Sequence, residues 1–286
     1  LLIMSGLPAS GKSTAAAKWQ SEDPDARTVI NWDNMRTQRY GPLWVFNRKE
    51  EEEMKAASFD IARRALRAGL SVCIDNTNLT TRARGKWESI AKEFGLVAIN
   101  EDFDTPIAEC VRRDKVRVKR VGRGVIERFG LFYGYIEFPA DRYAIFDVDG
   151  TLADCEHRRH HVAQKPKNWP AFFKECHLDP PKTAIINLAK MMKAAGYTIL
   201  VVSGRGIDQA GIVTEDWLDT HLGNEVYTHL FMRNSQDSRP DTEIKLEILE
   251  LLPKHKIHYI VDDRDGVVAA FRGAGMTVLQ CAAGNF

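Results

Sequence analysis

Two aspartates at the end of an apolar run have the spacing needed to attack and hydrolyse a phosphate ester. The run "YAIFD" ends in Asp147, and Asp149 follows two residues later, before a Gly-Thr turn. One carboxylate could attack phosphorus and form an aspartyl-phosphate, while the second could protonate the leaving alkoxide and later activate water. Because an anion must approach an anion here, the pair predicts a Mg²⁺ site that includes Asp147 and Asp149.

Polar residues at the ends of other predicted strands could complete this site. They are Ser203, Gly204, Arg205, Asp262 and Asp263, and Lys245 on the predicted helix between these strands joins them. The carboxyl ends of parallel strands meet at one edge of a sheet, so we expect these groups to converge, with Asp262 and Asp263 on the metal. Any one of them could instead cap a helix or form a turn. Their coincidence favours catalysis.

A second phosphate motif lies at the start of the chain, in "GLPASGKST" (6–14). It fits G-x-x-x-x-G-K-[ST] between an apolar strand and a helix. Backbone N–H groups and the start of the helix should hold phosphates, Lys12 should reach the β- and γ-phosphates, and Ser13 should bind Mg²⁺. The expected ATP-binding residues are Gly6, Ser10, Gly11, Lys12, Ser13 and Thr14.

The segment "NWDNMR" indicates an acceptor side for this kinase. Asp33 could take the proton of an attacking hydroxyl, and Arg36 could hold an anionic group of the acceptor. A helix cap and a solvated arginine are the alternatives. Asp75, at the end of "SVCID", could hold a Mg²⁺-bound water, or it could form a turn with Asn76.

A basic run, "VRRDKVRVKRVGRGVIER" (111–128), has eight basic and two acidic residues. Such a run is often a solvated helix face. Its charge imbalance and its glycines predict a mobile lid that closes arginines over the triphosphate. The alternative is a basic patch for a polyanionic substrate.

A long insertion, "CEHRRHHVAQKPKNWPAFFKECH" (155–177), follows the aspartate pair. It is too long for a tight turn and carries Trp169, Phe172 and Phe173, so we expect a cap over the phosphatase site. Its cysteines and histidines raise a zinc site as an alternative. Their spacing matches no standard finger, which favours surface or substrate-contacting histidines.

Strand-like and helical patterns alternate along the chain, which predicts an α/β protein with largely parallel sheets. Predicted strands are 1–4, 28–31, 71–75, 96–103, 143–147, 198–203, 227–232, 258–263 and 277–280, and predicted helices include 50–69, 81–95, 183–196 and 242–252. We place two domains at 1–139 and 142–286, with their boundary in "EFPADR" (137–142). With 286 residues and 44% hydrophobic content, each can bury its own core.

Composition limits the class of protein. The net charge of +1 provides no overall basic field for nucleic acid. The five cysteines are scattered without a Cys-x-x-Cys pair, which favours a reducing cytoplasm over a disulfide framework. Apolar runs fall short of the ~18 residues of a membrane span, so we expect no membrane association.

Together these residues resemble the phage-type bifunctional polynucleotide 5′-kinase/3′-phosphatase family. That family joins an N-terminal P-loop kinase to a C-terminal phosphatase of the haloacid dehalogenase superfamily, and the resemblance covers nearly the whole chain. It implies a parallel-sheet kinase domain and a Rossmann-like phosphatase with a small cap. One departure is Asn76, because the family prototype has an aspartate directly before the Thr-Asn pair.

The resemblance also implies residue roles. Asp33 would be the base for the 5′-hydroxyl, Arg36 would bind the acceptor's phosphate, and Arg113 and Arg117 would act from the lid. Asp147 would be the nucleophile and Asp149 the acid and base. The implied phosphoryl- and substrate-binding residues are Arg158, Ser203, Gly204, Arg205, Asp241 and Lys245.

The implied activity is nucleic-acid end healing. The enzyme would transfer the ATP γ-phosphate to 5′-hydroxyl ends of RNA or DNA and remove 3′-phosphates, with 2′,3′-cyclic phosphate as an additional candidate substrate. A polynucleotide ligase would be its functional partner, in the host cytoplasm if the protein is phage-encoded. The alternatives are a metabolic fusion of a small-molecule kinase with a small-molecule phosphatase, and a non-catalytic nucleotide sensor. The preference between RNA and DNA stays open, as does the oligomeric state, a homo-oligomer included.

Overall fold

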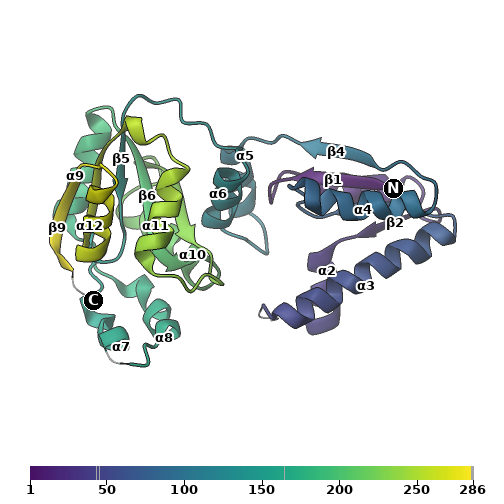
Figure 1. The fold of residues 1–286 in the computed structure, drawn as a ribbon, viewed down its shortest axis with the longest axis horizontal. Helices are drawn as coiled ribbons and strands as arrows, with labels where there is room; N and C mark the ends of the chain where they lie inside the picture. Colours follow the sequence, from purple (N-terminus) through teal and green to yellow (C-terminus); the bar gives the residue numbers. More distant parts are fainter. Residues whose placement is uncertain (43, 45, 164, 285–286) are drawn as a thin grey trace. The chain divides into compact units, whose positions relative to one another are not determined.

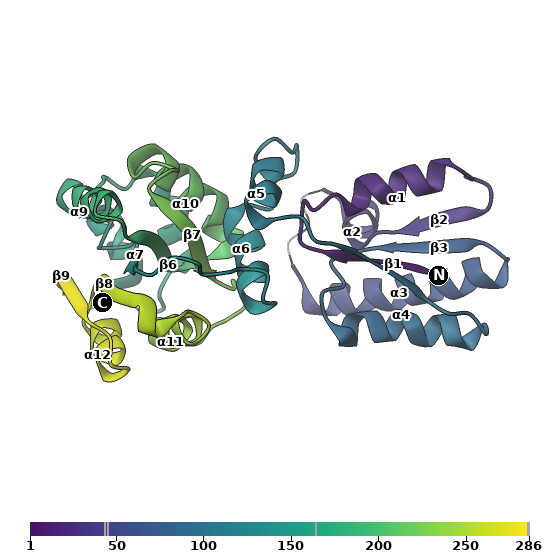
Figure 2. The same ribbon diagram turned by 90° about the horizontal axis from the view of Figure 1, so that it is seen from above.

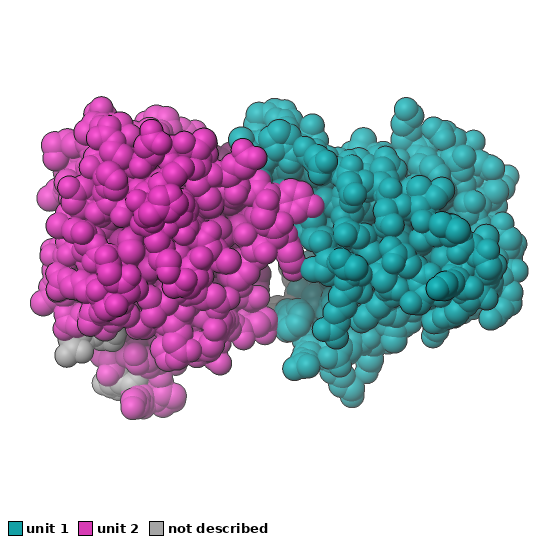
Figure 3. All heavy atoms as spheres, turned by 45° about the horizontal axis from the view of Figure 1, so that its top comes forward, with its two compact units in different colours: residues 1–113 teal, residues 114–286 magenta. Residues whose placement is uncertain are grey.

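The computed structural model describes residues 1–42, 44, 46–163 and 165–284, and its chain divides into two compact units, Leu1–Arg113 and Asp114–Phe286 (Figure 3). Each unit contains one parallel sheet with helices on both faces, which confirms the predicted fold class. The division comes earlier than the predicted boundary at 137–142. Each predicted strand and helix is present, with its ends shifted by a few residues.

The first unit has the strand order β2-β3-β1-β4. Its strands are β1 (Leu2–Gly6), β2 (Arg27–Ile30), β3 (Ser71–Asp75) and β4 (Ile99–Phe103), and its helices are α1 (Lys12–Ser21), α2 (Trp32–Tyr40), α3 (Arg48–Arg67) and α4 (Thr81–Glu93). The division between the units falls within α5 (Ile107–Lys115), after Arg113. Figure 2 shows α1 on one side of this sheet and α3 and α4 on the other.

Side chains that alternate along the strands of the first unit form the core on both faces of its sheet. Ile3 packs with Leu66 and Trp87 from α3 and α4, whereas the next residue, Met4, packs with Ala16 from α1. Successive side chains of a strand point to opposite faces, so a fully apolar run such as β1 belongs between two helical layers. This burial fixes the carboxyl end of β1, from which the phosphate-binding loop emerges.

The second unit has the strand order β7-β6-β5-β8-β9. Its strands are β5 (Tyr143–Phe146), β6 (Thr198–Gly206), β7 (Tyr227–Arg233), β8 (Ile257–Arg264) and β9 (Val278–Gly284). Its larger helices are α6 (Arg123–Phe132), α9 (Thr183–Ala194), α10 (Ile207–His221), α11 (Asp241–Glu250) and α12 (Asp265–Gly273), with a turn of 3₁₀ helix, η3 (Lys254–Lys256), before β8. The chain builds outward from β5 in both directions, and ligands of such sheets bind where the strand order reverses.

Helices pack on both faces of the second sheet. Residues of α9 and α10 pack against Ala144 and Phe146 of β5, whereas residues of α11 and α12 pack against Tyr143 and Ile145. All four strand residues are buried. The central strand is therefore held from both sides, and so is the aspartate that follows it.

A small cap lies between β5 and α9, as predicted. It consists of the short helices η1 (Glu156–Arg158), α7 (His160–Ala163), α8 (Trp169–Lys174) and η2 (Cys176–Leu178). Figure 1 shows α7 and α8 together at one end of the second unit. Cys155, Val162 and Phe172 form its buried core.

The segment from Asp114 to α6 groups with the second unit, which explains the early division. Lys115 Nζ lies 2.6 Å from Asp219 Oδ2, and Arg120 Nη2 lies 2.9 Å from Glu215 Oε2, so acids of α10 neutralise this part of the basic run. The buried Glu127 of α6 accepts a hydrogen bond from the backbone N–H of Leu230 in β7. A sequence window cannot show this pairing, because the acidic partners lie about 100 residues away.

Within the ranges that the structure describes, every helix is too short or too polar to cross a bilayer.

Candidate active sites

Three carboxylates meet at the carboxyl edge of the second sheet. Asp147 follows β5, Asp262 and Asp263 lie near the end of the neighbouring strand β8, and all three are buried, with ligand oxygens within 4.8 Å of one another. The Nζ atom of Lys245, from α11, lies 2.8 Å from Asp147 Oδ1 and 2.8 Å from Asp262 Oδ2. The structure thus brings together four of the residues predicted for the phosphatase site.

The electrostatics of this cluster fit a divalent cation. Burial raises the pKa of Asp147; Lys245 opposes this, and the charges of Asp262 and Asp263 raise the pKa further. Burial and Asp262 likewise raise the pKa of Asp263. Buried oxygen ligands that repel one another are a suitable donor set for Mg²⁺. Among the described residues, this is the group of acidic, histidine or cysteine side chains with metal-binding spacing.

Gly150 makes this arrangement possible. Its φ of 81° lies in the left-handed region that favours glycine. A Cβ atom at this position would collide with the carboxylate of Asp263. The glycine after the aspartate pair is therefore required by both its backbone conformation and its neighbour.

Asp149 is not part of the carboxylate cluster, although we predicted it as a metal residue. Its carboxylate is held by Arg205, whose Nη2 lies 2.6 Å from Oδ1, and by the Nη2 of Arg158. Burial disfavours the charge of Asp149, but the two guanidinium groups outweigh this and lower its pKa. The predicted residues Arg158 and Arg205 thus directly contact the carboxylate that we predicted as the acid and base.

A further buried carboxylate, Asp179, was missed by the sequence analysis. It accepts hydrogen bonds from Arg158 Nε (2.6 Å) and Arg205 Nη2 (2.7 Å), and its side chain is 0% exposed. It therefore fixes the two arginines that hold Asp149. It belongs to no motif and lies in an "LDPP" loop. The one available signal was that the predicted site contains two arginines, Arg158 and Arg205, which need carboxylate partners if they are buried.

The position of the Asp241 side chain depends on the absence of a side chain at Gly204. Arg233 Nη2 lies 3.2 Å from Asp241 Oδ1, and Arg264 Nη1 lies 3.4 Å from Asp241 Oδ2. A Cβ atom on Gly204 would collide with the carboxylate of Asp241, so glycine lets β6 approach this side chain. Ser203 is buried, and its Oγ accepts a hydrogen bond from the N–H of Arg205 (3.2 Å).

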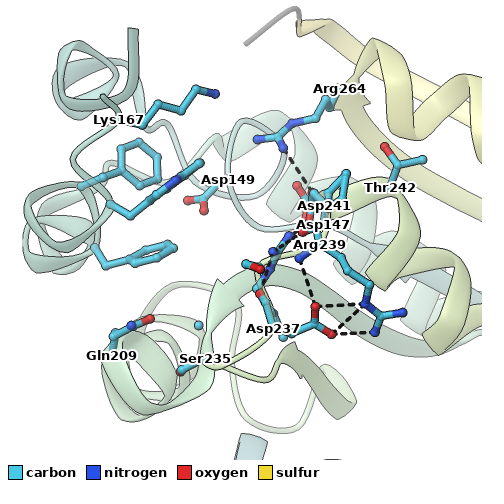
Figure 4. A pocket seen from close by; sticks show the side chains of 18 residues that line it. Asp147, Asp149, Lys167, Gln209, Ser235, Asp237, Arg239, Asp241, Thr242 and Arg264 are labelled. Carbon is cyan, nitrogen blue, oxygen red and sulfur yellow. Dashed lines mark hydrogen bonds and ion pairs between the residues drawn. The ribbon is translucent and has the colours of Figure 1, made fainter. Parts of the chain in front are cut away.

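Part of this site lines a cavity of about 560 Å³ in the second unit (Figure 4). Asp147 and Asp149 reach it from the sheet, and Lys167 reaches it from the cap. Figure 4 shows Asp149 between Lys167 on one side and Asp241 and Arg239 on the other. The lining residues are Asp147, Asp149, Lys167, Trp169, Phe172, Phe173, Gly204, Gly206, Gln209, Arg233, Ser235, Asp237, Ser238, Arg239, Pro240, Asp241, Thr242 and Arg264.

The described part of the cap does not assemble a zinc site. His157 Nε2 lies 2.9 Å from Asp179 Oδ1, and His161 Nε2 lies 3.2 Å from Glu175 Oε1. Burial raises the pKa of the Cys155 thiol to about 12 and also raises that of Cys176. His157 and His161 are thus paired with carboxylates, and the two cysteines are protonated, packed side chains.

The phosphate-binding loop of the first unit runs from β1 into α1, as predicted. Gly11 has a φ of 107°, which favours glycine, and precedes the helix. Lys12 Nζ donates hydrogen bonds to the carbonyl oxygens of Gly6 (3.0 Å) and Leu7 (2.7 Å) and lies 3.3 Å from Ser10 Oγ. The ammonium group therefore lies against the loop that would receive the phosphates.

A second cavity, of about 260 Å³, lies beside this loop. Ser13 and Asp75 both line it, and Asn31 Nδ2 donates to Asp75 Oδ2 (2.8 Å). Asn76 instead accepts a hydrogen bond from the N–H of Trp32 (3.0 Å). Asp75 rather than Asn76 thus shares a cavity with the predicted magnesium ligand Ser13.

The predicted acceptor residues lie outside this cavity. The side chain of Asp33, in the first turn of α2, is 84% exposed and contacts Arg36. Asn31, not Asp33, caps the helix. Arg36 Nε also donates to Glu51 Oε2 (2.7 Å), and this hydrogen bond raises the pKa of the arginine.

The two lid arginines fall in different units. Arg113 Nη1 donates to the carbonyl oxygen of Ser10 (3.2 Å), beside the phosphate-binding loop. Arg117 belongs to the second unit, where it lies 3.4 Å from Asp114 Oδ1. A role for Arg113 at the nucleotide is consistent with its position, whereas the role of Arg117 stays a prediction.

Comparisons with known proteins relate both units to phosphate chemistry. Residues 1–130 match the family described as "AAA domain". A virus protein named as a bifunctional polynucleotide kinase/RNA ligase, from Autographa californica nuclear polyhedrosis virus, is 23% identical over 294 residues, which cover 94% of this chain and 40% of the relative. The L-seryl-tRNA(Sec) kinase of Methanococcus maripaludis is 26% identical over 157 residues, which cover 54% of this chain and 58% of that kinase. The chain thus spans less than two thirds of either relative.

Among solved structures, a chain in the Pnkp1/Rnl/Hen1 RNA repair complex is 25% identical, with 100% of this chain and 96% of that chain covered and a TM-score of 0.42. Residues 141–286, more than half of the sequence, match the family described as "Polynucleotide kinase PNKP phosphatase domain". The chain therefore belongs to the polynucleotide kinase phosphatase family, with a P-loop unit ahead of its phosphatase domain.

Proposed function

We propose that this protein heals the ends of broken nucleic-acid strands. It would transfer the γ-phosphate of ATP to a 5′-hydroxyl end and remove phosphate from a 3′ end, with a 2′,3′-cyclic phosphate as a further substrate. One observation carries the proposal: a phosphatase domain of the polynucleotide kinase family, with Asp147 and Asp149 at its cavity, follows a P-loop in the same chain. The two activities act on opposite ends and together produce the termini that a ligase joins.

In the phosphatase, a carboxylate oxygen of Asp147 would attack phosphorus as the bond to the 3′-oxygen breaks. Lys245, 2.8 Å from Asp147, is placed to hold the phosphoryl group near the nucleophile. Asp149 would give a proton to the leaving 3′-oxygen and then take one from the water that hydrolyses the aspartyl-phosphate. The guanidinium groups lower the pKa of Asp149 and so favour its ionised form, from which the second role starts. The proton that it gives to the 3′-oxygen would therefore be taken up from solvent before that step.

A Mg²⁺ ion, when bound, would neutralise the negative charge of the carboxylates and of the phosphate. Asp147, Asp262 and Asp263 would hold it, because they are the buried carboxylates with suitable spacing. Asp149 serves the proton transfers instead.

In the kinase, Lys12 and the backbone N–H groups of the loop would bind the phosphates of ATP. Ser13 would bind Mg²⁺ at the cavity that it shares with Asp75. Asp33 would take the proton of the 5′-hydroxyl, with Arg36 on the acceptor's phosphate. Because Asp33 and Arg36 now contact each other, binding of the acceptor would have to separate them.

The experiment gives the wild-type protein one RNA and one DNA strand, each with a 5′-hydroxyl and a 3′-phosphate, together with ATP and Mg²⁺. We expect a 5′-phosphate and a 3′-hydroxyl on the same molecule, which a polynucleotide ligase can then circularise. The rates on the two strands will show which nucleic acid is preferred. Faster phosphorylation of sugars or nucleosides than of oligonucleotides would instead support a small-molecule kinase.

A further inference from the structure

Aromatic side chains of the cap form one wall of the phosphatase cavity. Trp169 and Phe173 stack with ring centroids 5.8 Å apart, and Phe172 meets Trp169 edge-on at 5.7 Å. Phe172 is buried, but Trp169 is 40% exposed. All three line the cavity that contains Asp147 and Asp149. A tryptophan that is held by packing yet open to a catalytic cavity can offer its indole to a ligand.

Other residues that line the cavity are polar. Gln209, Ser235 and Ser238 line it together with Arg239, which forms an ion pair with Asp237 (2.6 Å). Lys167 Nζ lies over the ring of Trp169, 5.4 Å from its centre, so a base that stacks on that face would displace this flexible side chain. The cavity thus offers an aromatic surface for a ring face and polar groups for hydrogen-bonding edges.

The cavity is larger than a phosphate requires. Its volume of about 560 Å³ lies within the usual range for sites that enclose an organic ligand of moderate size. A ligand whose phosphate reaches Asp147 therefore has room in this cavity for the rest of one nucleotide. A base pair would also need space for the partner strand, so an unpaired end fits better.

We propose that the phosphatase cavity binds an unpaired 3′ end, with the terminal base stacked on Trp169. This inference rests on the proposed 3′-phosphatase function and adds the substrate class. Stacking accepts any base, because every base has a π face, so we expect little sequence preference. Trp169 is a positioning residue here, since it would hold the base while the phosphate lies at Asp147.

The test uses single-stranded oligonucleotides that end in a 3′-phosphate and differ only in the last residue, which is a normal nucleotide or an abasic tetrahydrofuran analogue. We expect the wild-type protein to prefer the normal end in kcat/KM by about 5- to 150-fold, which corresponds to ~1–3 kcal/mol of stacking. Trp169→Ala should bring the preference close to one, and Trp169→Phe should keep most of it.

The matched control is Tyr133→Ala. Tyr133 is also exposed, at 42%, and stacks on Phe129, but it does not line the cavity. Its loss should leave the preference unchanged. A binding readout uses Asp147→Asn, which cannot attack, and a 3′-terminal 2-aminopurine whose fluorescence should fall on binding. The fall should disappear when Trp169→Ala is added.

The preference is the ratio of kcat/KM for the normal end to kcat/KM for the abasic end, measured in one variant. A partly unfolded cap would lower both values and would not imitate the loss of the preference. Equal loss on both substrates in Trp169→Ala would give Trp169 a merely structural role and overturn the inference. Equal hydrolysis of both substrates by the wild-type protein would also overturn it, while the proposed 3′-phosphatase function would stand. If the wild-type protein released phosphate from neither substrate, the proposed phosphatase function would be refuted, and the inference with it.

Discussion

The two units hold their reactive groups in opposite ways. In the phosphatase, Asp147, Lys245 and Arg205 are buried and already paired with one another or with neighbouring charges. In the kinase, Lys12 rests on its own loop carbonyls, and the side chain of Asp33 is 84% exposed. The second unit thus holds these groups in place among paired charges, whereas the first unit, under the proposed function, would have to rearrange around its two substrates.

The difference follows from the elements that carry the residues. Asp147 and Asp262 adjoin central strands that helices cover on both faces, and Lys245 comes from a helix packed on that sheet. Asp33 and Arg36 lie on the nine-residue helix α2, which buries none of its residues. Charges on buried strands keep their geometry without a ligand, but charges on an exposed helix do not.

The largest expected effect separates the two sites completely. Lys12→Ala should abolish 5′ phosphorylation and spare 3′ dephosphorylation, and Asp147→Asn should do the reverse, each by at least about 10³-fold. Labelled oligonucleotides resolved by end group measure both rates in one reaction. If either folded variant lost both activities, the two sites would not be independent.

A smaller effect tests the exposed reactive group of the first unit. Asp33→Asn should lower the kinase rate by about 10²–10⁴-fold, the usual contribution of a general base. It should leave the urea midpoint of unfolding unchanged, because the side chain is exposed. Arg39→Gln, on the same helix but outside the cavity that Ser13 lines, provides the control for helix disruption. An unchanged kinase rate in Asp33→Asn would exclude it as the base.

The buried charges of the second unit should contribute to its free energy of unfolding. Asp179→Asn leaves Arg158 and Arg205 without one of their carboxylate partners, so we expect the second unit to lose about 3–5 kcal/mol of unfolding free energy. Urea denaturation followed by circular dichroism measures this. Glu93→Gln, which breaks the exposed pair with Arg63, should change little. Similar midpoints for both variants would mean that the buried network is not preorganised.

The smallest expected effect concerns the metal. Mg²⁺ should stabilise the second unit, because it relieves repulsion among buried carboxylates; saturation at about 100 times Kd corresponds to ~2.7 kcal/mol. Thermal unfolding with and without Mg²⁺ measures the shift. Asp263→Asn should reduce it, and Asp208→Asn, an exposed acid on α10, should not. An equal shift in both variants would place the stabilising ion elsewhere.

The sequence predicted best where chemistry follows a buried strand. "YAIFD" and "HYIVDD" predicted both strands and the convergence of Asp147, Asp262 and Asp263, because an apolar run ending in a carboxylate specifies strand, burial and edge together. Asp179 could not be predicted, since its partners come from other segments and it lies in an irregular loop. The ion pairs of the basic run could not be predicted for the same reason: Asp219 and Glu215 neutralise part of it only in three dimensions.

The hydrogen bond between Glu127 and β7 affects which fragments of the chain would be protected from self-association. β7 is an edge strand, and unpaired edge strands recruit strands from other molecules. Arg123 and Glu127 of α6 occupy the carbonyl of Thr228 and the N–H of Leu230 on that edge. A phosphatase fragment that starts at residue 142 would expose this edge and should aggregate, whereas one that starts at Asp114 retains its own protection against self-association.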